Sequence, residues 1–189
     1  MTEPRPLSIP VILGTTRKGR MSAHAANFIF SELQKRAALT TELIDIAQLQ
    51  FPVDDAGEGA KDPRFSTAME RADAIVIVTP EYNHSFPGLL KHVLDSCLKE
   101  YIHKAAGIVG VSAGVFGGAR AIEHFQPVLR ELGLVSIFWD VNFGSVQKVF
   151  DEKGHLLDQA YVRRADKFLN ELIWMAKTLR YGRDNISQD

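Results

Sequence analysis

The chain has 189 residues, of which 46% are hydrophobic and 24% are charged; these values are typical of a globular protein rather than a disordered or collagen-like one. Lys and Arg total 22 against 23 Asp and Glu, and the formal net charge of −1 argues against a basic nucleic-acid or membrane-surface binder as the default. The single cysteine, Cys97, cannot form an internal disulfide, and no apolar run approaches the roughly 18 residues of a membrane span.

Short apolar runs alternate with segments of helical periodicity along the chain. Strands are predicted at residues 7–13, 41–46, 74–79, 105–111 and 134–141. Helices are predicted at residues 22–37, 64–71, 87–101, 119–132 and 158–179, the first of them capped by Ser22. Residues 48–63 are predicted to form a loop rich in Pro, Gly and Asp, and the polar residues 1–6 and 181–189 are expected to be frayed.

The predicted strands are almost continuously apolar, which is typical of parallel strands buried on both faces. Their alternation with helices predicts an α/β fold: a doubly wound, five-stranded parallel sheet with helices on both faces. We expect one domain over residues 1–189, located in the cytoplasm because the N-terminal residues lack the apolar segment of a signal peptide. Ligands of such sheets bind beyond the carboxyl ends of the strands, where a strand order of 2-1-3-4-5 would bring three polar loops into one crevice.

The loop after the first predicted strand, residues 14–22, is suited to hold a phosphate group. Thr15, Thr16 and Ser22 supply hydroxyl groups, Arg17 supplies a positive charge, and the following helix offers free backbone N–H groups. The glycine spacing is that of a P-loop, but Met21 stands where a P-loop needs its Mg²⁺-binding hydroxyl, which argues against a nucleoside triphosphatase. A polar turn that only caps the helix is an equally good interpretation of these residues alone.

The loop after the third predicted strand, residues 80–88, combines an aromatic ring, an amide and a proline turn. A planar ligand could rest on this backbone and stack near Tyr82. The alternative is an ordinary proline-bounded turn with a half-buried Tyr82, and these residues alone favour that alternative.

The loop after the fourth predicted strand carries a competing signal. Residues 110–114 match the G-x-S-x-G nucleophile elbow, and Asp140 and His155 follow Ser112 in the order of a catalytic triad. A serine hydrolase is therefore one hypothesis. The glycines that follow Ser112 argue for a flexible turn instead, since the helix of an elbow starts directly after its serine, and no HGGG-type oxyanion segment precedes it.

A metal site is not predicted, because the six histidines show no HExxH or comparable spacing. His84 lies inside the second of the three loops, whereas the other five histidines fit surface or packing positions better. Cys97 fits the role of a small buried hydrophobic residue.

Taken together, the three loops resemble those of the NADPH-dependent FMN reductase family of flavodoxin-like folds. Residues 80–91 are similar to its P-E-Y-N-x-S-x-P-G-x-L-K signature, residues 14–22 to its G-[ST]-x-R…S loop, and residues 112–121 to its S-x-G-x-x-G-G-x-R-A loop. His84 departs from the family, which often has a small residue at this position.

The resemblance implies a flavodoxin-like sheet of order 2-1-3-4-5 with an FMN site built from these loops. Residues implied to hold the FMN phosphate are Thr16, Arg17 and Ser22. Residues implied to line the isoalloxazine ring are Pro80, Glu81, Tyr82, Asn83 and His84, with Ser112, Gly114 and Gly117 at its polar edge.

The resemblance also implies an NAD(P)H oxidoreductase, in which hydride passes from NADPH or NADH through FMN to a quinone, flavin, azo compound, metal ion or O₂. Because this chemistry belongs to the cofactor, no catalytic side chain is predicted, and His84 is only a candidate contact for the substrate. Members of the family commonly complete the flavin site with a second subunit, which implies a homodimer or homotetramer. A serine hydrolase acting through Ser112 and a flavodoxin-type electron carrier are the alternatives.

Overall fold

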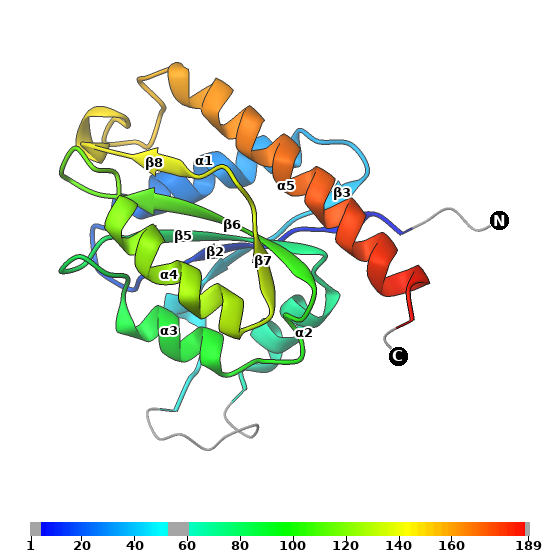
Figure 1. Ribbon diagram of the computed structural model, residues 1–189. Helices are drawn as coiled ribbons and strands as arrows, with labels where there is room; N and C mark the ends of the chain where they lie inside the picture. Colours follow the sequence, from blue (N-terminus) through cyan, green and yellow to red (C-terminus); the bar gives the residue numbers. More distant parts are fainter. Residues whose placement is uncertain (1–4, 53–60, 188–189) are drawn as a thin grey trace.

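The computed structural model describes residues 5–52 and 61–187 (Figure 1). The strands are β1 (Leu7–Ser8), β2 (Val11–Leu13), β3 (Leu39–Thr40), β4 (Leu43–Asp45), β5 (Ala74–Pro80), β6 (Lys104–Val111), β7 (Leu134–Ser136) and β8 (Val141–Phe143). The helices are α1 (Ser22–Gln34), α2 (Pro63–Arg71), α3 (Gly88–Asp95), α4 (Ala119–Glu131) and α5 (Ala160–Asn185), with short 3₁₀ turns η1 (Ile46–Gln48) and η3 (Val146–Lys148). Part of the predicted loop 48–63, at residues 53–60, lies outside the described residues. No helix in the described ranges is both long and apolar enough to cross a membrane.

The central feature is a parallel sheet with strand order β4-β2-β5-β6-β7, and β8 pairs with the carboxyl end of β6 as β7 pairs with its start. Counted along the chain, this is the order 2-1-3-4-5. The predicted flavodoxin-like, doubly wound sheet is therefore confirmed. Because the strands are parallel, the carboxyl ends of β2, β5 and β6 lie at the same edge of the sheet.

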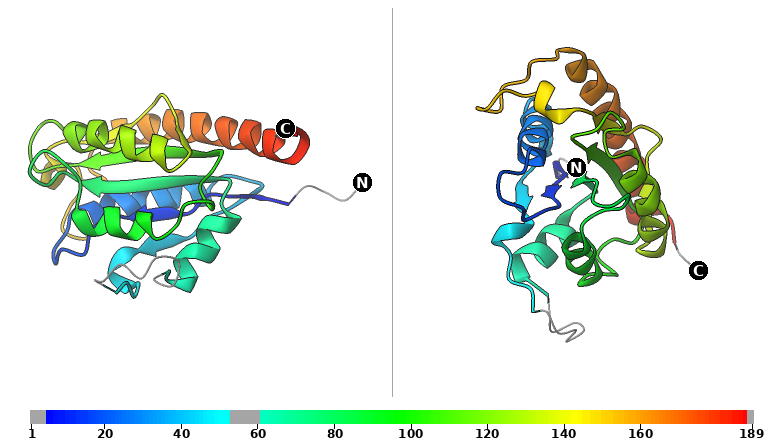
Figure 2. Two further views of the ribbon diagram at one scale, coloured as in Figure 1. Left: turned by 60° about the horizontal axis from the view of Figure 1, so that its bottom comes forward. Right: turned by 90° about the vertical axis from the view of Figure 1, so that its left-hand side faces the viewer.

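Helices cover both faces of the sheet (Figure 2). On one face α1 and α5 pack against the strands, with Ile29 and Phe168 fully buried. On the other face α2, α3 and α4 do the same, with Phe65, Leu90 and Phe125 fully buried. The apolar sides of α3 and α4 therefore face the sheet.

The first predicted strand, residues 7–13, is divided by Pro10 into β1 and β2. Proline has no backbone N–H to donate, so the ladder of hydrogen bonds cannot continue through it. β1 pairs with β3, whereas β2 pairs with β4 and β5. The predicted second strand at 41–46 is correspondingly shorter, because only Leu43–Asp45 pairs within the main sheet.

The helix predicted at residues 87–101 ends at Asp95. The Ser96 hydroxyl donates a hydrogen bond to the Val93 carbonyl oxygen at 2.7 Å, a local contact of the kind that competes with helix continuation. Cys97 is buried in the turn that follows, and burial raises the pKa of its thiol to about 11. The thiol is therefore protonated at neutral pH.

The fifth predicted strand, residues 134–141, is interrupted. β7 and β8 pair with opposite ends of β6, and residues 137–140 lie between them. Phe138 is 78% exposed there, and the ammonium group of Lys167 on α5 lies 3.3 Å from the centroid of a Trp139 ring. The interruption places an aromatic pair at the edge of the sheet.

Asp140 belongs to this interruption, and its Oδ1 atom is buried without a hydrogen-bond partner among the described residues. Burial, aided by the negative charge of Glu123, raises the pKa of Asp140 from 3.8 to about 6. We expect Asp140→Asn to raise the melting temperature at pH 7.5, because it removes an ionised group that burial disfavours. The gain should shrink as the pH falls through about 6 and vanish below about pH 4, where the wild-type carboxyl is protonated in both the folded and the unfolded states.

Melting curves of both proteins across this pH range check the expectation. Asp166→Asn, which changes an exposed carboxylate on α5, is the control. A gain that persists unchanged at pH 3.5 would contradict the assignment to ionised Asp140.

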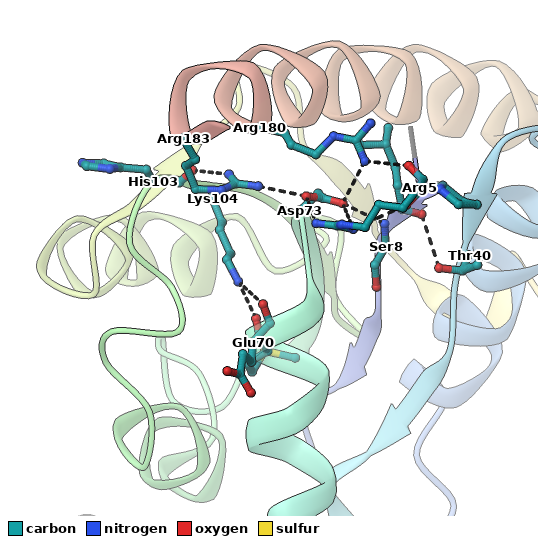
Figure 3. Close-up of polar contacts among 12 residues, drawn as sticks. Arg5, Ser8, Thr40, Glu70, Asp73, His103, Lys104, Arg180 and Arg183 are labelled. Atoms are coloured by element: carbon teal, nitrogen blue, oxygen red, sulfur yellow. Dashed lines mark hydrogen bonds and ion pairs between the residues drawn. The ribbon is translucent and has the colours of Figure 1, made fainter. Parts of the chain in front are cut away.

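Asp73, at the amino-terminal edge of the sheet, joins the two ends of the described chain (Figure 3). Its side chain is fully buried. Arg5 donates two hydrogen bonds to the carboxylate at 2.8 and 2.9 Å, and Arg183 donates one at 2.9 Å. Arg180 lies 3.6 Å away, and the backbone N–H of Ser8 donates at 3.0 Å. One carboxylate therefore holds three guanidinium groups from opposite ends of the sequence.

The described ends are more ordered than predicted. Residues 181–185, expected to be frayed, continue α5 to Asn185. Arg5, within the expected frayed range 1–6, is fixed on Asp73. The sequence shows only that the two ends are polar, whereas the structure shows that Arg5 and Arg183 pair with the buried carboxylate of Asp73. Residues 1–4 and 188–189 lie outside the described chain.

Lys104 lies near this cluster and binds the C-terminal turn of α2 (Figure 3). Its Nζ donates to the carbonyl oxygens of Met69 and Glu70 at 2.7 and 2.8 Å, which satisfies acceptors in the last turn of that helix. Burial lowers the pKa of Lys104 from 10.5 to about 8. The amine keeps N–H groups to donate in either protonation state.

Candidate functional site

Three loops meet at the carboxyl edge of the sheet, as the sequence predicts; they follow β2, β5 and β6. A cavity of about 640 Å³ is lined by Thr15, Thr16, Arg17, Glu81, Tyr82, Asn83, Pro87, Gly88 and Leu89. A second cavity, of about 370 Å³, is lined by Arg17, Lys18, Gly19, Arg20, Met21, Ser22, Pro80, Glu81, Tyr82, Val111, Ser112, Ala113 and Val146. Arg17, Glu81 and Tyr82 line both, so the two cavities adjoin, and we call them together the cleft.

Thr15 and Tyr82 tie the first loop to the second. The Thr15 Oγ1 and Tyr82 Oη atoms are 2.9 Å apart, and Thr15 is 2% exposed. The guanidinium carbon of Arg17 lies 5.9 Å from the centroid of the Tyr82 ring, within the range of a cation–π contact. The sequence offers the Thr15 hydroxyl to a phosphate, but in the structure this hydroxyl bonds to Tyr82 and fixes the aromatic ring that lines both cavities.

Ser22 does not cap α1 as predicted. Met21 occupies the N-cap position, and no side chain caps the helix there. Ser22 is the first residue of the helix and is buried, and its Oγ has no hydrogen-bond partner in the described chain. A buried hydroxyl without a partner is unusual, and this one lines the smaller cavity beside the N-terminus of a helix.

Arg20 lines the same cavity, but its positive charge is neutralised within the protein. It forms an ion pair with Asp45 at the end of β4, and each of the two side chains is only 17% exposed. This pair connects the first loop to the neighbouring strand. Arg17 and Lys18 are the other two basic residues of the loop that line the smaller cavity.

The second loop is a tight two-residue turn. The backbone N–H groups of Tyr82 and Ser85 donate to each other's carbonyl oxygens at 2.7 and 2.9 Å. Between them Asn83 and His84 have φ values of 50° and 67°, the positive values of a type I′ turn, in which Asn-Gly is the favoured pair. His84 thus occupies a position where glycine is favoured.

Glu81 and Arg120 connect the second loop to the third. They form an ion pair in which the Glu81 side chain is only 6% exposed. Arg120 also donates from Nη1 to Nε2 of His84 at 2.8 Å, and its guanidinium carbon lies 5.2 Å from the centroid of the Phe116 ring. Since arginine only donates, His84 Nε2 is the acceptor in this contact. Arg120 stands in the motif of the third loop, but its sequence position alone gives no sign of these partners.

The third loop folds back on itself. The Ser112 hydroxyl donates to the Gly114 carbonyl oxygen at 2.8 Å, and the Ser145 N–H donates to the same oxygen at 2.8 Å. A Cβ atom built on Gly114 meets no atom within 4 Å among the described residues. Gly117 has a φ of 61° and lies against Asn142, where a Cβ would come within 2.8 Å of the Asn142 Cβ.

The serine hydrolase hypothesis is wrong. The Ser112 hydroxyl bonds to a carbonyl oxygen in its own loop, and the His155 ring pairs with Asp151 at 2.8 Å. The buried Oδ1 of Asp140 has no hydrogen-bond partner in the described chain. The three residues therefore form no relay, and the match to G-x-S-x-G reflects a small-residue turn.

Most predicted site residues lie at the cleft, and three do not line it. Those that line at least one cavity are Thr16, Arg17, Ser22, Pro80, Glu81, Tyr82, Asn83 and Ser112. Those that line neither cavity are His84, Gly114 and Gly117. His84 faces Arg120 instead, and the two glycines shape the third loop.

Comparison with known proteins gives a consistent result. The sequence profile of the family described as NADPH-dependent FMN reductase matches residues 7–147. An NAD(P)H-dependent FMN reductase of Pseudomonas aeruginosa is 35% identical over 128 residues, covering 64% of this chain and 69% of that protein. A quinone reductase of Pseudomonas putida is 30% identical over 172 residues, covering 83% of this chain and 91% of that protein. Among solved structures, FerB, a flavoenzyme NAD(P)H:(acceptor) oxidoreductase from Paracoccus denitrificans, has the same fold, with a TM-score of 0.74 at 23% identity over 90% of this chain and 98% of its own.

The matched region runs from β1 into η3 and so includes all three loops of the cleft. The motifs that resemble the family in sequence are the segments that the fold brings together. The chain belongs to the NADPH-dependent FMN reductase family and is an NAD(P)H-dependent oxidoreductase that acts through a flavin.

Proposed function

We propose that this chain binds FMN in the cleft and uses it to pass electrons from NAD(P)H to a small-molecule acceptor. The observation that carries the proposal is the buried hydroxyl of Ser22, which lines the smaller cavity without a hydrogen-bond partner in the described chain. A phosphate group would accept that hydrogen bond at the N-terminus of α1, and Arg17 and Lys18 would neutralise its charge. The residues present therefore fit the phosphate of FMN, and Thr16 completes the hydroxyl set.

The same geometry suits the flavin ring. Pro80, Glu81, Tyr82 and Asn83 line the cleft on the side of the second loop, and Ser112 lines it on the side of the third. Gly114 and Gly117 line neither cavity but shape this loop: the Gly114 carbonyl oxygen accepts the hydrogen bond of the Ser112 hydroxyl, and Gly117 has a positive φ of 61°. His84 accepts a hydrogen bond from Arg120 and lines neither cavity, so we do not count it among the residues that hold FMN.

Bound FMN would supply the N5 atom that takes hydride from NAD(P)H and returns the electrons to an acceptor. The protein's own residues would orient the flavin and enclose it. The Thr15–Tyr82 contact fixes an aromatic side chain at the cleft, and the turn from Tyr82 to Ser85 holds its backbone rigid. No side chain of the cleft is required as a nucleophile.

The acceptor class follows from the relatives. A quinone reductase covers most of this chain, and an NADPH azoreductase of Bacillus is also related at 31% identity. Quinones and azo compounds are therefore the first acceptors to test, ahead of free flavin, metal ions and O₂. Planar acceptors of this kind fit a site in which donor and acceptor use the same exposed ring face in turn.

The visible absorbance spectrum tests the proposal. Protein mixed with FMN and then freed of excess ligand should keep the flavin bands, and NADPH or NADH should bleach them in the absence of oxygen. Retained flavin that neither nucleotide bleaches would favour an electron carrier of the flavodoxin type. Protein that neither retains nor reduces FMN would contradict the proposed function.

We also propose that the chain forms a homodimer or homotetramer. Val115 and Phe116 of the third loop are 79% and 63% exposed beside the cleft, where a second subunit would cover them. Sedimentation equilibrium should then give at least twice the chain mass of 21.0 kDa. A single species of 21.0 kDa at micromolar concentration would reject this oligomer.

A further inference from the structure

We infer that Arg120 is a positioning residue: it clamps the second loop of the cleft to the third and thereby sets how long the flavin stays bound. The inference rests on the proposed function and adds to it a residue that lies outside the cavities. Arg120 belongs to the first turn of α4 and lines neither cavity. Any effect that it has on a ligand in the cleft must therefore pass through the residues that it contacts.

Arg120 contacts both loops at once. Its guanidinium group forms an ion pair with Glu81 of the second loop and donates a hydrogen bond to Nε2 of His84 at 2.8 Å. On the side of the third loop, the guanidinium carbon lies 5.2 Å from the centroid of the Phe116 ring, within the range of a cation–π contact. One planar group with several donors thus joins two loops, which the single ammonium group of a lysine cannot do in the same way.

The place of Arg120 in α4 is unfavourable for the helix itself. The N-terminal end of a helix carries a partial positive charge, so a cation in the first turn costs about 0.3–1 kcal/mol. The first turn of α4 has no acidic residue to offset this cost, and its N-cap residue, Gly118, supplies no side-chain hydrogen bond. The stability of α4 therefore does not account for an arginine at this position, whereas the contacts with the second loop do.

The position of the second loop matters to a ligand because its residues line the cleft. Glu81 and Tyr82 line both cavities, and the Glu81 side chain is only 6% exposed. Without Arg120, the Glu81 carboxylate would be a nearly buried ion that has lost its positive partner, which is a strongly destabilising arrangement. The loop can relieve it by moving until the carboxylate reaches water. Removing Arg120 should therefore loosen the second loop and shorten the residence of a ligand that the loop contacts.

The first experiment uses the flavin-free protein. Residue-resolved hydrogen exchange by NMR compares the wild type with Arg120→Met, which keeps an unbranched side chain but removes the charge and the donors. The backbone N–H groups of Glu81 and Tyr82 are hydrogen-bonded at 3.0 and 2.7 Å, and they should exchange about 10-fold faster in the variant. The N–H of Asp73, which donates to the Ser8 carbonyl oxygen at 2.8 Å at the opposite edge of the sheet, should exchange at an unchanged rate.

Further variants separate a clamp from a general loss of stability. His84→Gly removes one acceptor, and glycine suits the φ of 67° at this position, so the turn itself should persist. It should also accelerate exchange at Glu81 and Tyr82, but adding it to Arg120→Met should cause no further acceleration, since the two residues act through one contact. Arg120→Lys keeps a positive partner for Glu81 and should give an intermediate rate. Arg163→Met, which changes an exposed arginine on α5, is the control and should behave as the wild type.

The second experiment measures how long FMN stays bound. The rate constant of FMN dissociation, followed by the recovery of flavin fluorescence after dilution, should rise about 10-fold in Arg120→Met. The association rate constant should change much less, because changes at a binding surface act mainly on dissociation. Arg120→Lys should recover part of the lost residence time, and Arg163→Met should leave it unchanged.

Unchanged exchange at Glu81 and Tyr82 in Arg120→Met overturns the clamp, and an unchanged dissociation rate of FMN overturns its effect on the flavin. Equal acceleration at Asp73 also overturns the inference, because it shows a general loss of stability. If Arg120→Met does not fold, His84→Gly and Arg120→Lys carry the same test. Failure of the proposed function looks different: the wild-type protein then binds no FMN, while the exchange rates still report on the clamp.

Discussion

Replacing Asp73 with alanine is expected to lower the free energy of unfolding by about 3–5 kcal/mol, because it removes one partner of a buried ion-pair cluster. The Asp73 side chain is fully buried and receives Arg5, Arg180 and Arg183 as well as a backbone N–H. Without it, three guanidinium groups repel one another around a cavity. For a chain of this size the melting temperature should fall by roughly 6–20 °C.

Thermal or urea unfolding of the flavin-free protein measures this loss. The matched control is Asp166→Ala, which removes an exposed carboxylate paired with Arg36. Exposed pairs of this kind contribute about 0–1 kcal/mol, so the control should barely move the transition. If Asp73→Ala and Asp166→Ala shifted the transition equally, the cluster would not anchor the chain ends.

Replacing Arg17 with alanine is expected to weaken FMN binding by about 10- to 100-fold, because charge-assisted hydrogen bonds to phosphate are strong. Arg17 lines both cavities and stands next to Lys18 in the loop that leads to Ser22. Riboflavin lacks the phosphate, so its affinity should hardly change. The difference between the two ligands assigns the loss to the phosphate.

Equilibrium titrations of flavin fluorescence with both ligands check this expectation. Arg163→Ala, an exposed arginine on α5, controls for the change in net charge. Equal losses for FMN and riboflavin would mean that Arg17 acts through the Tyr82 ring rather than through the phosphate. Unchanged FMN affinity would contradict the assignment of the loop.

The sequence predicts the layers of this fold well because they follow from local pattern. The apolar strands β5 and β6 match the predicted ranges to within a residue, since each is a continuous apolar run; the prediction ends β5 at Thr79, whereas Pro80 still pairs with Val111 of β6. The bounds that were predicted wrongly have local chemical causes, which the periodicity of apolar residues does not reveal. Pro10 divides the first strand, and the Ser96 side chain bonds back into α3 near its end.

The cleft is predictable to the extent that its residues follow strand ends. Sequence alone cannot pair side chains from different loops, so the contacts of Thr15 with Tyr82 and of Glu81 with Arg120 are absent from the prediction. The false triad fails for the same reason: the order Ser112, Asp140, His155 says nothing of distance. Motif spacing locates the loops, and only the fold shows which partners meet.

Neither edge of the sheet is well suited to pair with a strand of another molecule. β4 has three residues, and the opposite edge is divided into β7 and β8, also of three residues each. An unpaired strand edge invites association with a second strand, and a short or broken edge offers it few consecutive donors and acceptors. The segment 137–140, which removes the continuous strand that the sequence predicts, thereby protects this protein against aggregation through its sheet.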